Sequence, residues 1–287
     1  MDFGLIFANT MPFTDRDGLQ LLATGAEAAG FESVWTVEHV IYPDAYESTY
    51  PYDPSGKFAG AADTPLPDPL VWLSFVAAAT ERLRVATGIL ILPQRNPLVL
   101  AKEVATLDHL SGGRVELGVG VGWLREEFEA LGVPWERRGA RTDDYVAAMR
   151  AVWAADHAEH HGEFTSFSGA SVNPKPVRDT VPVHIGGHSP AAAARAGRIG
   201  DGFFPGKGDL GELLAVMRDA AEAAGRDPSA IEVTSWSPGL FGDDPVGACE
   251  ELAAQGVTRV VVPAFVFARD TAAALTDFGE RVIRRVG

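Results

Sequence analysis

Short apolar or β-branched runs alternate with amphipathic stretches from one end of the chain to the other, and this alternation constrains the fold more than any other feature. It is typical of repeated βα units. Strands are predicted at residues 3–7, 33–37, 84–91, 115–119, 182–185, 202–204, 231–235 and 259–262. Helices are predicted at residues 15–29, 69–80, 97–110, 142–155, 190–198, 210–224, 245–255 and 271–285. Eight strands with intervening helices favour an α/β fold closed into a (β/α)8 TIM barrel.

The predicted helices carry start and stop signals. Proline suits a first helical turn, where the amides lack helical partners, and it is found at Pro69, Pro97, Pro190 and Pro245. Glycine favours the left-handed conformation that ends many helices, and it follows at Gly30, Gly225 and Gly256. The predicted boundaries should therefore hold to within a few residues.

Two insertions account for the length beyond the roughly 250 residues of a typical barrel. The first, residues 41–67, is rich in Pro, Tyr, Asp and Gly and follows the second strand, which predicts a lid or substrate-binding loop. The second, residues 160–180, precedes the fifth strand and is predicted to contain a hairpin. No linker or internal repeat is apparent, so we expect one domain over residues 1–287.

A doubly wound open sheet is the structural alternative, because alternating βα units also build that fold. Its dinucleotide fingerprint is missing. The glycines at positions 118, 120 and 122 follow a predicted strand, but their spacing is not GxGxxG. The sequence therefore favours the barrel.

Composition limits the partners and the compartment. The 39 acidic residues exceed the 24 basic ones, and the net charge of −15 repels nucleic acid and anionic lipid. No stretch approaches the roughly 18 consecutive apolar residues of a membrane span, and the N-terminus lacks the pattern of an export signal. The single cysteine, Cys249, excludes an intramolecular disulfide. We expect a cytoplasmic protein that acts on a small molecule, with no nucleic acid or membrane partner.

Candidate functional groups follow the strands, at the barrel face where such sites gather. His39 has an imidazole suited to proton exchange near neutral pH, and its neighbour Glu38 is placed to orient it or to bond a ligand. A loop histidine bonded to backbone is the simpler interpretation. The run Gly186, Gly187, His188 and Ser189 joins a strand to a helix start, which suits a phosphate, although an ordinary tight turn has the same pattern.

Other chemistries lack their patterns. His157, His160 and His161 are close in sequence but have no complementary Cys or spaced acid, so we expect no metal site. No serine lies in a GxSxG elbow, so we expect no covalent acyl chemistry.

Several segments, in their order and spacing, resemble the luciferase-like monooxygenase superfamily and, within it, the F420-dependent oxidoreductase branch. They are WTVEH at 35–39, TGI at 87–89 with PQRNP at 93–97, AKEVATLD at 101–108 with LSGGR at 110–114, LGVGVGW at 117–123 with EF at 127–128, and GG at 186–187 with DGF at 201–203. The match covers roughly residues 1 to 205. The last third of the chain agrees only in its strand and helix pattern.

The resemblance implies a flavin-like ring in the barrel mouth, with its phosphate near residues 186–189. His39 then corresponds to the histidine beside the reactive ring face, and Gly88–Ile89 to a non-proline cis peptide that supports the ring. We expect cofactor contacts from Glu38, His39, Gly88, Ile89, Glu126, Gly186, Gly187, His188 and Ser189. Tyr42, Tyr50 and Trp123 are expected to line a substrate pocket, and Trp123 replaces the acid of the F420-dependent glucose-6-phosphate dehydrogenases.

The leading functional prediction is an F420-dependent oxidoreductase that transfers a hydride between reduced deazaflavin and a small apolar or aromatic substrate. An FMN-dependent luciferase-like monooxygenase is the second hypothesis, and a non-catalytic flavin-binding protein is the third. Homodimers that associate through helices are common among the apparent relatives, so a homodimer is expected as well.

Overall fold

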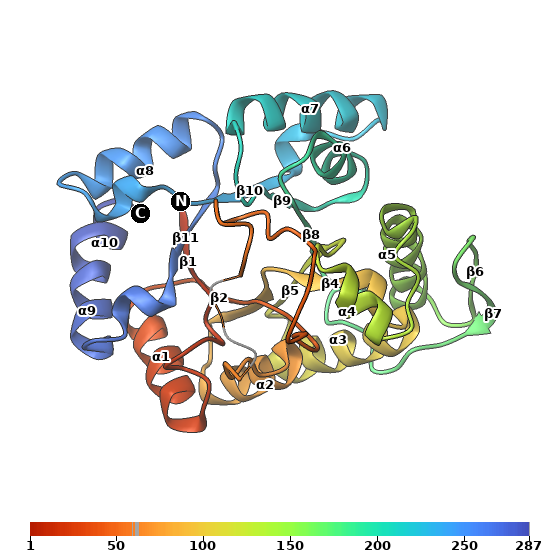
Figure 1. The fold of residues 1–287 in the computed structure, drawn as a ribbon, viewed down its shortest axis with the longest axis horizontal. Helices are drawn as coiled ribbons and strands as arrows, with labels where there is room; N and C mark the ends of the chain where they lie inside the picture. The colour runs from red at the N-terminus through yellow and green to blue at the C-terminus, as the bar shows by residue number, and fades with distance from the viewer. Residues whose placement is uncertain (59, 61–62, 287) are drawn as a thin grey trace.

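A closed parallel barrel forms the centre of the computed structural model, which describes residues 1–58, 60 and 63–286. In barrel order the strands are β1 (Asp2–Ile6), β2 (Ser33–Thr36), β3 (Arg84–Thr87) with β4 (Leu90–Ile91), β5 (Val115–Gly120), β8 (Val183–Gly186), β9 (Gly202–Phe204), β10 (Glu232–Ser235) and β11 (Arg259–Pro263). Pairing of β11 with β1 closes the ring. Helices surround the strands (Figure 1), and the predicted TIM barrel is confirmed.

The helices agree closely with the sequence prediction. They are α1 (Arg16–Ala29), α2 (Pro69–Ala79), α3 (Pro97–Ser111), α4 (Arg125–Ala130), α5 (Arg138–Ala154), α6 (Pro190–Ile199), α7 (Leu210–Ala223), α8 (Pro245–Ala254), α9 (Thr271–Phe278) and α10 (Arg284–Val286). The glycines predicted to end helices have positive φ angles, 94° at Gly30, 69° at Gly225 and 98° at Gly256. Among the described helices, none is both long and apolar enough to cross a membrane.

Two helical predictions need correction. The short helix α4 was not predicted, because its six residues are too few to show an apolar period. The last helix, predicted as continuous over residues 271–285, contains a π-helical turn at Gly279–Ile283 between α9 and α10. A Cβ atom on Gly279 would lie 2.3 Å from the carbonyl oxygen of Ala29, so this turn packs directly on the end of α1.

The third strand, predicted as one run over residues 84–91, is divided in two. β3 ends at Thr87, and β4 resumes at Leu90 and pairs with β5. The peptide bond between them, Gly88–Ile89, is cis, as predicted from the resemblance.

Both predicted insertions are present. Residues 37–68 leave the barrel after β2 and contain neither helix nor strand where they are described; positions 59, 61 and 62 lie outside the described residues. The second insertion forms the antiparallel pair β6 (Ala158–His161) and β7 (Ser166–Ala170), which begins two positions before the predicted segment. This hairpin projects from the barrel beside α5 (Figure 1).

Charged side chains fill the end of the barrel where the strands begin. Arg259, the first residue of β11, has a side chain only 2% exposed and forms ion pairs of 3.1–3.2 Å with Glu32, Glu116 and Glu232. His184 Nε2 lies 2.9 Å from Glu116 Oε2. Ligand atoms of Glu116, His184 and Glu232 lie within 4.8 Å of one another, a spacing that suits a metal ion. Because Arg259 already supplies a positive charge to both carboxylates, we assign this cluster to stability.

Candidate functional site

His39 lies just beyond the end of β2 and is held by a buried carboxylate. Its Nδ1 atom is 3.1 Å from Oε2 of Glu127, a residue of α4. The His39 side chain is 9% exposed and the Glu127 side chain is fully buried. The other oxygen of Glu127 accepts hydrogen bonds from the backbone amides of Val40, at 2.6 Å, and Ile41, at 3.3 Å. An acceptor on Nδ1 fixes the ring orientation and leaves Nε2 as the atom available for proton exchange.

Aromatic rings surround His39. The ring centroids of Tyr42, Phe58 and Trp123 lie 5.6, 5.7 and 5.6 Å from the imidazole centroid. Tyr50 packs edge-on against Trp123 at 5.1 Å. Burial raises the pKa of Tyr50 to about 12, so its hydroxyl stays neutral at physiological pH. Of the three predicted pocket residues, Tyr42 and Trp123 therefore pack against the predicted catalytic histidine, and Tyr50 packs behind Trp123.

Glu38 turns away from His39. Its carboxylate forms an ion pair with Arg95 and accepts a 2.5 Å hydrogen bond from the amide of Ile91. Burial raises the pKa of Glu38, and the charge of Arg95 opposes that effect only in part. Glu38 thus bonds Arg95 and the segment after β4, whereas His39 bonds α4. The expectation that Glu38 orients the imidazole is wrong, because Glu127 occupies that position.

Glu126 fastens the first insertion to α4. It accepts hydrogen bonds from the amides of Glu47, at 2.7 Å, and Ser48, at 3.1 Å, and from the Ser48 hydroxyl at 2.7 Å. Burial would raise its pKa, but these hydrogen bonds outweigh burial and lower it to about 2. Both oxygens of Glu126 are thus engaged in anchoring the first insertion, and its cofactor contact stays a prediction.

Gly88 and Ile89 form a floor in the mouth of the barrel. A Cβ atom on Gly88 would lie 2.9 Å from the Ile6 side chain, which leaves no room for a larger residue. Cβ atoms built on Gly120 and Gly186 would lie 2.5 and 2.4 Å from the side chain of Ile89. Glycine at these positions therefore admits Ile89 between β5 and β8.

The run from Gly186 to Ser189 leads from β8 into α6. Gly187 has a φ of 128°, and Ser189 caps α6 by accepting a hydrogen bond from the amide of Ala192 at 3.2 Å. The Nδ1 atom of His188 is buried without a hydrogen-bond partner among the described residues. Burial, aided by the charge of Lys207, lowers the pKa of His188. This junction offers polar groups at the positive end of a helix dipole.

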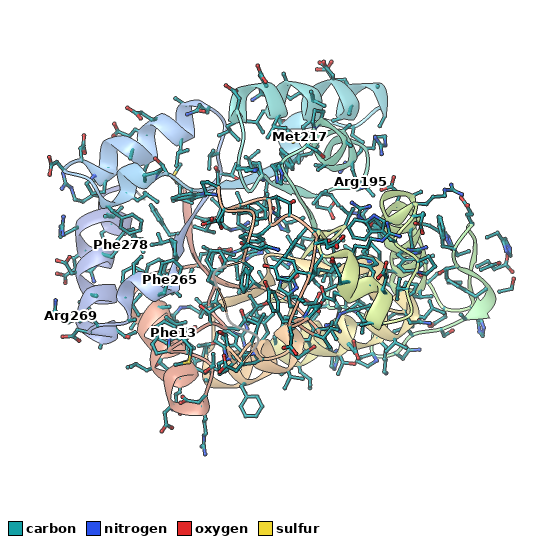
Figure 2. The ribbon with its side chains drawn as sticks, viewed as in Figure 1. Phe13, Arg195, Met217, Phe265, Arg269 and Phe278 are labelled. Atoms are coloured by element: carbon teal, nitrogen blue, oxygen red, sulfur yellow. The ribbon has the colours of Figure 1, made fainter. Side chains whose placement is uncertain are left out.

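Two cations near this junction are engaged elsewhere. Arg195 extends from α6 toward α5, where it forms an ion pair with Asp143 (Figure 2). Lys207, which follows β9, donates a hydrogen bond to the carbonyl oxygen of Pro51 in the first insertion. Lys207 thus connects the insertion to the opposite side of the mouth.

The sequence reasoning did not assign the role of Glu127. Glu127 entered the sequence analysis only within the EF pair at 127–128, and its pairing with His39 joins residues 88 positions apart. That pair was the available signal, and both of its residues are fully buried. Phe58, a third ring around the imidazole, also lacked a sequence signal.

Comparison with known proteins gives a consistent result. The family model described as luciferase-like monooxygenase matches residues 8–283. An uncharacterized protein of Mycobacterium tuberculosis is 36% identical over 244 residues, 84% of this chain and 83% of its own. The F420-dependent glucose-6-phosphate dehydrogenase of Kineococcus radiotolerans is 34% identical over 79% of this chain and 65% of its own. The FMNH(2)-dependent dimethylsulfone monooxygenase of Pseudomonas putida is 33% identical over 54% of this chain and 44% of its own.

Solved structures share the fold. The F420-dependent tetrahydromethanopterin reductase of Methanopyrus kandleri superposes with a TM-score of 0.78 and 19% identity, covering 100% of this chain and 99% of its own. The monooxygenase RslO1 of Streptomyces bottropensis superposes with a TM-score of 0.78 and 23% identity, covering both chains fully.

Proposed function

This chain belongs to the luciferase-like monooxygenase family, and we propose that it is an F420-dependent oxidoreductase acting on a small apolar or aromatic substrate. The observation that carries the proposal is the His39–Glu127 pair, enclosed by aromatic rings at the mouth of the barrel. An oriented imidazole beside a water-poor pocket is what a proton transfer coupled to hydride transfer requires.

The residues present fit a flavin-like group. The cis Gly88–Ile89 bond and the glycines that admit Ile89 provide a floor that side chains at those positions would fill. Gly187, His188 and Ser189 would hold a phosphate, which offers an acceptor to the unpartnered Nδ1 of His188. When bound, F420 supplies hydride chemistry that the protein's side chains do not possess.

The protein's own part would be proton transfer and exclusion of water. With Nδ1 of His39 directed at the Glu127 carboxylate, the proton would be gained or given at Nε2. The aromatic rings of the first insertion cover the imidazole and keep water from it. Trp123 presents an indole ring where the related sugar-phosphate dehydrogenases carry an acid, which favours an apolar substrate.

The second candidate is an FMN-dependent monooxygenase, supported by the similarity to the dimethylsulfone enzyme. A fluorescence-monitored titration of the purified protein with F420 and, separately, with FMN distinguishes the two. We expect F420 to bind at least about tenfold more tightly, equivalent to about 1.4 kcal/mol. The reverse preference would favour the monooxygenase, and binding of neither would contradict the cofactor site. The third candidate, a non-catalytic flavin-binding protein, predicts binding without turnover.

We also propose a homodimer formed through α2 and α3, which pack on each other. Exposed apolar side chains mark both helices: Val71 (61% exposed) and Phe75 (57%) on α2, Val99 (56%) and Leu110 (78%) on α3. Such a face suits a second copy of the chain. We also propose, from the sequence, that the protein is cytoplasmic and that residues 1–287 form a single domain.

The molar mass in solution, measured by light scattering for the unsubstituted protein and for Phe75→Asp, tests the proposed dimer. We expect a dimer for the unsubstituted protein and a monomer for Phe75→Asp, because the charge would be buried at the interface. Phe241→Asp, at an equally exposed phenylalanine on another face, should remain a dimer. A monomeric unsubstituted protein would contradict the homodimer, and a dimeric Phe75→Asp would contradict this face.

A further inference from the structure

The first insertion crosses the mouth of the barrel from one strand to the strand opposite. It leaves the barrel after β2, and its residues Pro51 and Tyr52 contact the loop after β9. In the ring of strands, β9 is four pairings away from β2 in either direction, through β1, β11 and β10 or through β3, β5 and β8. The crossing segment can be followed over the face of the barrel in Figure 1. A ligand on the Gly88–Ile89 floor would therefore lie beneath it.

The near side of the insertion is fixed to α4. Glu126 and Glu127 together accept hydrogen bonds from four backbone amides between residues 40 and 48. Hydrogen bonds to a carboxylate are stronger than those between neutral groups. We therefore expect this part of the insertion to stay in place when a ligand enters.

The far side is held by two weaker contacts. The ammonium of Lys207 donates a hydrogen bond to the carbonyl oxygen of Pro51, and neither residue is buried. The ring of Tyr52 lies edge-on against the imidazole of His188, with 5.2 Å between the centroids, and its side chain is 46% exposed. A Cβ atom on Gly206 would lie 2.4 Å from the Tyr52 ring, so glycine at that position permits the contact. Neither contact involves a carboxylate.

The residues between the two sides form a small closed loop. The amide of Tyr50 donates a 2.8 Å hydrogen bond to the carbonyl oxygen of Gly56, and the amide of Gly56 donates a 3.0 Å hydrogen bond to that of Asp53. These bonds lie within residues 50–56 and would survive a movement of the whole loop. The Tyr50 ring packs on Trp123, beside α4, which places the pivot of such a movement on the near side.

We propose that residues 50–56 are a flap that opens to admit the cofactor and closes over it, and that Lys207 and Tyr52 are the positioning residues that hold it shut. The proposal rests on the proposed function, because the flap covers the site assigned there to the cofactor. The shut flap excludes water from the mouth, as loops that close over active sites do. Loss of either contact raises the fraction of open protein, and with it the rates of both entry and release.

The rates of F420 entry and release, measured by stopped-flow fluorescence, test the flap. In Tyr52→Ala we expect both rates to rise about fivefold, because an edge-to-face aromatic contact is lost, while Kd changes by less than about twofold. Tyr52→Phe keeps the ring on His188 and should match the unsubstituted protein. Faster release with unchanged entry would mean that Tyr52 binds the cofactor directly. That result, or two unchanged rates, would overturn the proposal.

Lys207→Met tests the second contact and should also raise both rates by about fivefold. Its matched control is Lys102→Met, because Lys102 on α3 donates in the same way to a carbonyl oxygen, that of Asn173. The control should leave both rates unchanged. Slower entry in Lys207→Met would show that the ammonium attracts the anionic cofactor, which would contradict its role in holding the flap.

A measurement without cofactor separates failure of the flap from failure of the proposed function. Burial, aided by the charge of Lys207, lowers the pKa of His188. Tyr52→Ala uncovers the imidazole, so the pKa of His188, followed by NMR, should rise toward its ordinary value. Tyr52→Phe should leave it in place, and His188→Gln identifies the signal. An unchanged pKa in Tyr52→Ala would overturn the proposal. If FMN binds and F420 does not, the proposed cofactor is wrong, and FMN serves for the same two rates.

Discussion

Replacing His39 with alanine is expected to lower turnover by about 10²-fold or more while leaving the affinity for F420 nearly unchanged. The imidazole is the group that exchanges a proton in the proposed reaction, whereas the floor at Gly88–Ile89 and the junction at Gly186–Ser189 are the segments proposed to hold the cofactor. Steady-state turnover and a fluorescence titration measure the two effects separately. Equal turnover in both proteins would contradict the role of His39.

The carboxylates Glu126 and Glu127 provide a matched pair for the same experiment. Glu127→Gln keeps the shape of the contact with His39 but replaces a carboxylate that only accepts hydrogen bonds with an amide that also donates them, so the imidazole is held less firmly. Turnover should then fall by about tenfold or more. Glu126→Gln, one residue away and bonded to Ser48 instead, should leave turnover unchanged. Equal turnover in the two variants would show that Glu127 does not act through His39.

The fold could be predicted from local patterns because most of its elements are long or clearly marked. Most barrel strands are apolar or β-branched runs, and proline at the first turn identified the start of α2, α3, α6 and α8. The interruption of the third strand was not predicted. The cis bond at Gly88–Ile89 was predicted only from the family resemblance, since nothing in the local sequence fixes it. The helix α4 has six residues and no visible period, so it was missed.

The candidate site was predicted less completely, because it depends on contacts between distant segments. The sequence analysis proposed the neighbouring Glu38 to orient His39, but Glu38 pairs with Arg95 instead. The partner, Glu127, comes from α4, the helix that the sequence did not reveal. Recognising α4 would have placed Glu126 and Glu127 about 100° apart on a helix, one toward the insertion and one toward the barrel.

The charged end of the barrel was not anticipated, although its members carry a signal. Arg84, Glu116 and Arg259 are charged residues at the start of otherwise apolar strands. The Glu116 and Arg259 side chains are 1% and 2% exposed, so solvent cannot satisfy them, whereas the Arg84 side chain is 36% exposed. Arg259 pairs with three carboxylates, so its loss would remove the pair with Glu232 and leave Glu32 and Glu116 with Arg84 as their remaining guanidinium partner.

Arg259→Met is therefore expected to destabilise the protein by about 3–5 kcal/mol at pH 7, measured by chemical denaturation. Burial raises the pKa of Glu116, but His184 and the charges of Arg259 and Arg84 lower it overall from 4.5 to about 2. The lowered pKa of Glu116 stabilises the folded protein above pH 4.5, and this stabilisation is lost as the pH falls toward 2. In Arg259→Met the Glu116 carboxylate is relieved by protonation, so the difference between the two proteins should narrow below pH 4.5. If the stability difference between the two proteins did not depend on pH, it would reflect lost packing instead. The control is Arg281→Met, at an exposed ion pair with Asp277, which should change the free energy of unfolding by less than about 1 kcal/mol.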